Sequence, residues 1–186
     1  MSNETQRIKI EIAKNNKDFQ LIKNGVVVVK GQKPKWYSSE IQFRYNNKTY
    51  NIKKKGFWGT SFSILQGGQL FGDIIWSFKT GAKIILKDSD LNTSHYYLKA
   101  ETVGKWYSSN RQYILNKNEK TTALTIHYAF KKWKESIEAE FNDKSNADYV
   151  LLVAALFLMR QQQSAEGAGS AGALLMSVCL SSKKTT

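Results

Sequence analysis

The chain has 186 residues, a formal net charge of +13, a hydrophobic content of 41% and an aromatic content of 12%. This length favours one domain with a core large enough to fold without cross-links, and the composition is that of an ordinary globular protein. The only cysteine, Cys179, excludes an internal disulfide framework and favours a reducing compartment. Residues 1–7 are polar and lack the apolar stretch of a secretory signal, so we expect a cytoplasmic protein.

The positive charge is the strongest departure from an average composition. It predicts attraction to polyanions, which include nucleic acid, an anionic membrane face and an acidic protein partner. A lysine-rich solvated surface explains the same charge without any partner, and we weigh the two explanations equally.

Residues 7–141 alternate between apolar and polar side chains with the period of β-strands. Ile8, Ile10 and Ile12 show the pattern at the start of this region. Asn24-Gly25 and Gly67-Gly68 are tight-turn signals between such runs. Gly72, inside a run, indicates a bulge or a bend. Turn signals every ~8–12 residues divide the region into about a dozen short strands, as in an all-β sandwich or barrel.

The run from Asp148 to Arg160 has a different character. Its only polar side-chain group between these two residues is the hydroxyl of Tyr149. Its Leu, Ala and Met residues favour a helix, Ser145 and Asn146 offer an N-cap, and Asp148 and Arg160 then fall in the first and last turns, where they suit the helix dipole. A helix that is apolar on every side must be buried on every side, and this one is shorter than the ~20 residues of a membrane span. The residues expected in its buried surface are Tyr149, Leu151, Leu152, Val153, Ala155, Leu156, Phe157 and Met159.

One architecture buries both the apolar strand faces and this helix. The sheet closes into a barrel of about twelve mostly antiparallel strands, and the hydrophobic C-terminal helix runs through its bore. We therefore predict a mainly β domain over residues 1–163, with the helix at approximately 146–163. Residues 164–186 are predicted to form a tail rich in small residues, which either docks on the barrel as a cap or is disordered.

A sequence echo indicates that the barrel has two related halves. Lys35-Trp36-Tyr37-Ser38-Ser39 recurs at residues 105–109, and the residues that follow align as Gln42 with Gln112, Phe43 with Tyr113 and Asn46 with Asn116. A duplication would place equivalent hairpins at related positions, whereas coincidence in a sequence of low diversity would not.

The Asp148-Tyr149-Val150-Leu151-Leu152-Val153-Ala154-Ala155-Leu156 motif is similar to the central helix of LURP-one-related proteins. Over residues 7–163 the chain resembles the tubby-like superfamily, which also includes tubby C-terminal domains and phospholipid scramblases. The resemblance implies a barrel of about twelve strands around a C-terminal helix. It also implies association with anionic phospholipid. The chain lacks a clear scramblase calcium-site pattern, a proline-rich N-terminal arm and a cysteine cluster for acylation, so the sequence leaves scrambling activity undecided.

Residue patterns for enzyme chemistry are scarce. His95 and His127 fall on the faces opposite the apolar sets of their strands, and an exposed polar role explains them better than a ligand pair. Cys179 has no histidine near it in the sequence, and no zinc spacing exists. Asp88 and Asp90 lack the glycine and the terminal glutamate of an EF-hand loop. We therefore predict no catalytic residue, no metal site and no cofactor.

The basic runs beside aromatic residues are the main functional candidates. Lysine next to aromatic side chains at a hairpin end suits an anionic bilayer surface, because the cations bind headgroups and the rings enter the interface. The same residue types suit a nucleic-acid backbone with stacked bases, and a solvated loop beside a core tryptophan explains them equally well. The candidate residues are Lys53, Lys54, Lys55, Phe57, Trp58, Lys131, Lys132 and Lys134.

Two functional hypotheses follow. The first is a non-enzymatic barrel that associates peripherally with anionic phospholipid, without a transmembrane span. The second is a structural or regulatory module that binds a protein or a nucleic acid through its basic surface.

Overall fold

The computed structural model describes residues 7–14, 17–33, 40–56, 61–77, 81–87, 93–103, 110–131, 134–142 and 148–164. These residues form strands and one helix. The strands are β1 (Arg7–Ile12), β2 (Asp18–Lys23), β3 (Val26–Gln32), β4 (Ile41–Tyr45), β5 (Lys48–Lys55), β6 (Ser61–Gln66), β7 (Gln69–Ser77), β8 (Gly81–Lys87), β9 (Thr93–Thr102), β10 (Arg111–Lys117), β11 (Thr121–Lys131) and β12 (Lys134–Phe141). The helix comprises residues 149–164.

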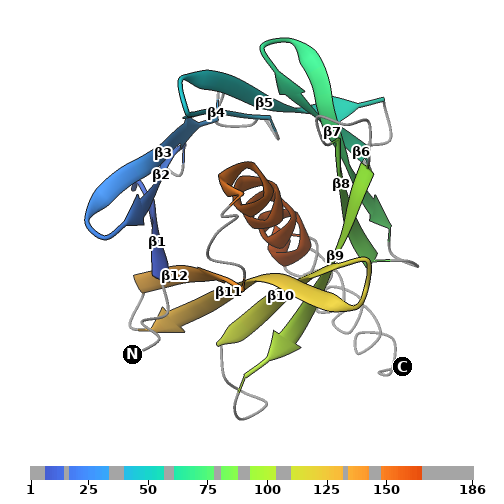
Figure 1. Ribbon diagram of the computed structural model, residues 1–186. Coiled ribbons are helices and arrows are strands. Elements are labelled where there is room, and N and C mark those ends of the chain that lie inside the picture. The colour runs from blue at the N-terminus through green and yellow to red at the C-terminus, as the bar shows by residue number, and fades with distance from the viewer. Residues whose placement is uncertain are drawn as a thin grey trace, which may run out of the picture.

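The strands form one closed antiparallel barrel in chain order (Figure 1). Each strand pairs with its neighbour in the sequence, and β1 closes the ring by pairing with β12 from Arg7↔Glu140 to Ile10↔Ile137. Arg7 Nε also donates a hydrogen bond of 2.7 Å to Glu140 Oε1 on the outside of this seam. The predicted fold class, a closed twelve-stranded barrel with a C-terminal helix, is confirmed.

The helix lies inside the ring of strands, as Figure 1 shows. Every residue from Tyr149 to Met159 is buried, and Leu152, Ala154, Ala155, Leu158 and Met159 have no exposed surface. The predicted burial on every side is therefore confirmed. Inward-facing residues of the strands complete one continuous core around the helix, for example Ile64, Ile84 and Ile126, each fully buried.

Aromatic contacts fix the helix against different parts of the wall. Tyr149 packs against Tyr45 of β4 and Phe141 of β12, with ring centroids 5.1 Å and 5.7 Å apart. Nearer the other end, the Phe157 ring meets Phe62 of β6 edge-on at 4.7 Å. Because β4, β6 and β12 are spread around the barrel, these contacts set the position of the helix along and across the bore.

The start of the helix differs from the prediction. Asp148 is the N-cap rather than a first-turn residue, because its Oδ1 accepts hydrogen bonds from the backbone N–H groups of Val150 (2.9 Å) and Leu151 (3.1 Å). An N-cap side chain satisfies the N–H groups of the second and third helical residues in this way. Ser145 and Asn146, the predicted caps, lie outside the described residues.

The predicted irregularity at Gly72 is confirmed. Ile64 of β6 pairs with Gly72 but Leu65 pairs with Leu70, so Phe71 is an extra residue in β7. A Cβ at position 72 would lie 2.4 Å from the carbonyl oxygen of Ile85 on the neighbouring β8, so the backbone leaves no room for a side chain there.

Because neighbouring strands run in opposite directions, the connections between them alternate between the two rims of the barrel. The rim where the odd-numbered strands end, and where the helix reaches its C-terminal part, is here called mouth A. The opposite rim, mouth B, holds the N-terminus of the helix and the tight turns with positive backbone φ at Asn24-Gly25, Asn46-Asn47, Gly67-Gly68 and Asn118-Glu119. The two predicted Asn-Gly and Gly-Gly turns are confirmed.

The internal echo agrees with the structure in part. Phe43 in β4 and Tyr113 in β10 are both buried, and their strands lie six positions apart around the ring. Asn46 and Asn116 are not equivalent, because Asn46 is in a turn after β4 and Asn116 is inside β10. The repeated segments 35–39 and 105–109 lie outside the described residues.

Candidate anion-binding mouth

Lys53, Lys54 and Lys55 form the exposed end of β5 at mouth A. The strand alternation gives them different directions. Lys54 shares the inward parity of the buried Tyr50 and Ile52, so it stands at the rim of the bore, whereas Lys53 and Lys55 have the outward parity. The run therefore presents cations on both sides of one rim segment.

Lys55 is the least available of the three cations. Its Nζ lies 3.3 Å from Asp73 Oδ1 of β7, and Ser63 of β6 also donates to that carboxylate oxygen at 3.4 Å. The Lys55 side chain is 58% exposed, so this ion pair contributes little to stability, but it offsets part of the charge.

Lys131 and Lys134 form a second exposed cation pair at mouth A. They are direct partners in the last register position of the β11–β12 hairpin. Directly opposed residues have Cβ atoms about 5 Å apart, and like charges at that spacing destabilise the pairing. Neither lysine makes an ion pair with any residue in the described ranges, so an anion bound between them would relieve a repulsion that the chain leaves in place.

The structure brings these two predicted clusters to the same rim. The β5–β6 and β11–β12 connections both join an odd strand to the next even strand, and they lie six strands apart, on opposite sides of mouth A. Phe57, Trp58 and Lys132, the other predicted site residues, lie outside the described residues.

An ion pair that the sequence analysis did not find ties the helix to the wall at mouth A. Arg160 donates from Nη1 to Glu135 Oε1 (2.6 Å) and from Nη2 to Glu135 Oε2 (2.5 Å), and Nη1 also reaches Gln163 Oε1 at 3.1 Å. Two parallel charge-assisted bonds of this kind hold a guanidinium in one orientation. The pKa of Tyr128 on the adjoining β11 is raised. Burial is the largest cause, and the neighbouring Glu135 carboxylate is the second. This network fixes the end of the helix beside the β11–β12 hairpin, where Lys134 precedes Glu135.

The two histidines lie on the outer wall, as the sequence pattern predicts. His127 Nε2 is 3.9 Å from Glu140 Oε1, and His95 Nε2 is 3.5 Å from Thr93 Oγ1. Within the described ranges, no three His, Cys, Asp or Glu side chains gather in a way that could hold a metal ion.

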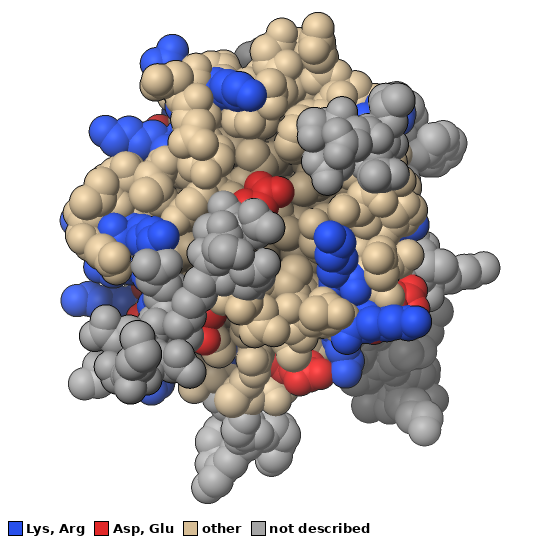
Figure 2. All heavy atoms as spheres, in the orientation of Figure 1, with Lys and Arg blue, Asp and Glu red and all other residues tan. Residues whose placement is uncertain are grey.

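Surface charge is spread widely on the face drawn in Figure 2. Lys and Arg side chains lie around the periphery of this face, with acidic side chains among them and near its centre. This face therefore carries no single basic patch among the described residues.

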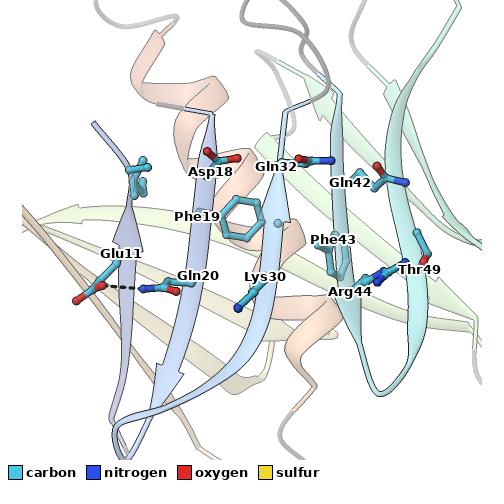
Figure 3. A pocket seen from close by; sticks show the side chains of 13 residues that line it. Glu11, Asp18, Phe19, Gln20, Lys30, Gln32, Gln42, Phe43, Arg44 and Thr49 are labelled. Carbon is cyan, nitrogen blue, oxygen red and sulfur yellow. Dashed lines mark hydrogen bonds between the residues drawn. The ribbon is translucent and has the colours of Figure 1, made fainter. Parts of the chain in front are cut away.

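An outer groove of about 710 Å³ crosses β1 to β5 (Figure 3). Its polar side chains come from successive strands, with Glu11 of β1 accepting a hydrogen bond of 2.9 Å from Gln20 of β2. The Phe19 ring covers Gly31, where an added Cβ would lie 2.1 Å from Phe19 Cζ. Acidic and basic residues both line the groove, so its charge favours neither anions nor cations.

Comparison of the chain with models of protein families, with curated proteins and with solved structures found no match. Among the described residues, the helix falls short of the length and apolar character that a membrane-crossing helix needs.

Proposed function

We propose that the protein is a non-enzymatic barrel that binds anionic phospholipid surfaces peripherally through mouth A. The observation that carries the proposal is the placement of Lys53 and Lys54 on one side of this rim and of Lys131 and Lys134 on the other, all four exposed. Lys131 and Lys134 are directly opposed and make no ion pair with the described residues, which favours an anionic partner.

The spacing of the clusters favours a surface over a small anion. Because the clusters lie across the barrel from each other, one phosphate group cannot contact both, whereas a bilayer presents many headgroups in one plane. A lysine near an anionic bilayer contributes about 1 kcal/mol at physiological salt. Four lysines would then contribute about 4 kcal/mol, roughly a thousandfold in affinity if their effects add.

Membership of the tubby-like superfamily is part of this proposal. A barrel closed around a C-terminal hydrophobic helix is the plan that the resemblance implies, and the observed fold supports it at that level. Association with anionic phospholipid follows from the same resemblance and agrees with the position of the lysines.

Vesicle co-sedimentation over a salt series tests the proposal. We expect the fourfold variant Lys53→Glu/Lys54→Glu/Lys131→Glu/Lys134→Glu to lose binding to phosphatidylserine-containing vesicles and to keep its melting temperature. The matched control is Lys48→Glu/Lys87→Glu/Lys117→Glu/Lys120→Glu, which changes the same charge at exposed positions on mouth B. Lys14 and Lys17 are unsuitable as controls, because they flank the β1–β2 connection at mouth A.

Equal loss of binding in both fourfold variants would show that the net charge, and not mouth A, attracts the membrane. Wild-type protein that ignores anionic vesicles but shifts a single-stranded nucleic acid in a gel would replace the lipid proposal with the nucleic-acid alternative.

A further inference from the structure

A second, internal cavity of about 510 Å³ opens between the helix and the barrel wall at mouth A. It lies within the ~300–1,000 Å³ range of small-molecule sites in proteins. Its lining comes from β1, β2 and β4, from the residues that flank the β3–β4 and β11–β12 connections, and from one face of the helix. The apolar lining residues are Ile10, Ile12, Phe19, Ile41, Phe130, Val153, Leu156 and Phe157.

This cavity is a gap in the packing around the helix. Val153, Leu156 and Phe157 are spaced so that they share one helix face, and this face looks toward Ile10 and Ile41 across the cavity. Ile41, Leu156 and Ile10 keep 9%, 8% and 6% of their surface exposed, whereas Leu152 and Leu158 on the same helix keep none. Leu156 is thus the least buried of the helix residues from Tyr149 to Met159, and it lies on the face that lines the cavity.

The wall beside the cavity explains the gap. β3 and β4 share only the pairs Lys30↔Arg44, Gly31↔Phe43 and Gln32↔Gln42 within the described residues. Gly31 contributes no side chain to the inner row, and Phe19 lies over it. Phe19 lines both this cavity and the outer groove, as do Ile12 and Asp18, so these three residues lie between the two spaces.

The rim of the cavity is charged and its interior is apolar. The lining contains three basic side chains and two acidic ones, which gives it a formal net charge of +1. They are Lys17, Lys33 and Arg160, and Asp18 and Glu135. Arg160 and Glu135 bind each other, which leaves the excess positive charge on the side of Lys17 and Lys33. An apolar interior with a basic rim complements an amphiphile that carries one alkyl chain and one anionic end.

We propose that this cavity binds a free fatty acid, with the alkyl chain beside Val153 and Leu156 and the carboxylate at Lys33. The lining runs along the helix from Val153 to Gln161, about 12 Å at 1.5 Å per residue. The site goes beyond the vesicle-binding surface, since it uses neither the β5 lysines nor the opposed pair of the β11–β12 hairpin.

Displacement of cis-parinaric acid, a fluorescent fatty acid, by unlabelled fatty acids of increasing chain length tests the proposal. Each added methylene should raise the affinity about fourfold until the cavity is full, after which the affinity should level off. Lys33→Ala should weaken binding of the acids about tenfold and should leave binding of their methyl esters unchanged. The matched control Lys48→Ala, an exposed lysine on mouth B, should bind the acids as the wild type does.

Two independent substitutions would fill the cavity, Leu156→Trp and Val153→Phe. The melting temperature of each variant shows whether it folds. A folded filling variant should lose fatty-acid binding and keep vesicle binding, which separates this site from the proposed membrane surface. Absence of saturable binding to the wild type, an affinity that does not change with chain length, or undiminished binding by a folded filling variant would overturn the proposal. Equal binding of acids by Lys33→Ala and wild type would overturn the role of the basic rim.

Discussion

Asp148 combines two opposing effects at the start of the helix. Its two backbone hydrogen bonds favour the carboxylate, but burial is the larger effect and raises the pKa of Asp148 above the ordinary value of 3.8. The charged form is therefore disfavoured in the folded state. An acid whose pKa rises on folding lowers the free energy of unfolding as the pH increases from its unfolded-state pKa through its folded-state pKa.

We predict that Asp148→Asn becomes progressively more stable than the wild type as the pH is raised from about 3 to about 7. Asparagine caps helices about as well as aspartate and carries no charge to desolvate. Thermal unfolding of both proteins across this pH range measures the difference. A constant difference in melting temperature would contradict the burial effect. Asp148→Ala is the control. Because neither Ala nor Asn titrates, it should be about 1 kcal/mol less stable than Asp148→Asn at every pH, since both cap bonds are lost.

Tyr113 buries a hydroxyl for which the described residues provide no hydrogen-bond partner. A buried polar group without a partner destabilises the folded state by about 1–3 kcal/mol. The equivalent position in the other half of the barrel is Phe43, so a phenyl ring fits this kind of site. We predict that Tyr113→Phe raises the melting temperature, as measured by calorimetry. A lower melting temperature would show that the hydroxyl has a stabilising partner.

At the scale of elements, the helix could be predicted from its residues because an all-apolar run has only one stable environment. Its first residue could not, since Ser145, Asn146 and Asp148 are all acceptable caps by type. In the structure the Asp148 carboxylate takes the cap position by accepting from Val150 and Leu151. The Arg160–Glu135 pair was missed for a similar reason, because nothing local links the start of β12 to the end of the helix.

We predict that Leu152→Asp or Ala155→Glu abolishes folding. Each places an unpaired charge among residues with no exposed surface, which costs several kcal/mol, a large part of the stability of a domain. Ser164→Asp, at an exposed position of the same helix, is the control and should fold. Circular dichroism and thermal unfolding measure the outcome. A soluble Leu152→Asp protein with an unchanged melting temperature would contradict the central position of the helix.

At the scale of the whole molecule, closure of the barrel was predictable because the strand faces and the helix need each other as packing partners. The meeting of the two lysine clusters at one rim was not. In an antiparallel meander the rim that a connection occupies depends on whether the number of preceding strands is odd or even, and sequence patterns leave the strand count uncertain by one or two. A miscount of one strand between Lys55 and Lys131 would have placed the clusters on opposite rims.

The internal cavity was also beyond the sequence. In the sequence, Gly31 is a single glycine within a strand. Only the pairing of β3 with its neighbours β2 and β4 places Phe19 over it. Whether side chains or a cavity fill the space between the helix and the wall depends on such packing details. These details leave no periodic pattern in the sequence.

The central functional claim is that mouth A, and not mouth B, faces the membrane. Thr102 and Thr121 are exposed residues of the same type, at the mouth A end of β9 and the mouth B end of β11. Each can be changed to cysteine in a Cys179→Ser background and labelled with an environment-sensitive fluorophore. The measurement is quenching of the label by brominated lipid in anionic vesicles. We predict strong quenching of the label at position 102 and none at position 121, whereas equal quenching at both positions, or quenching at 121 alone, would contradict the account.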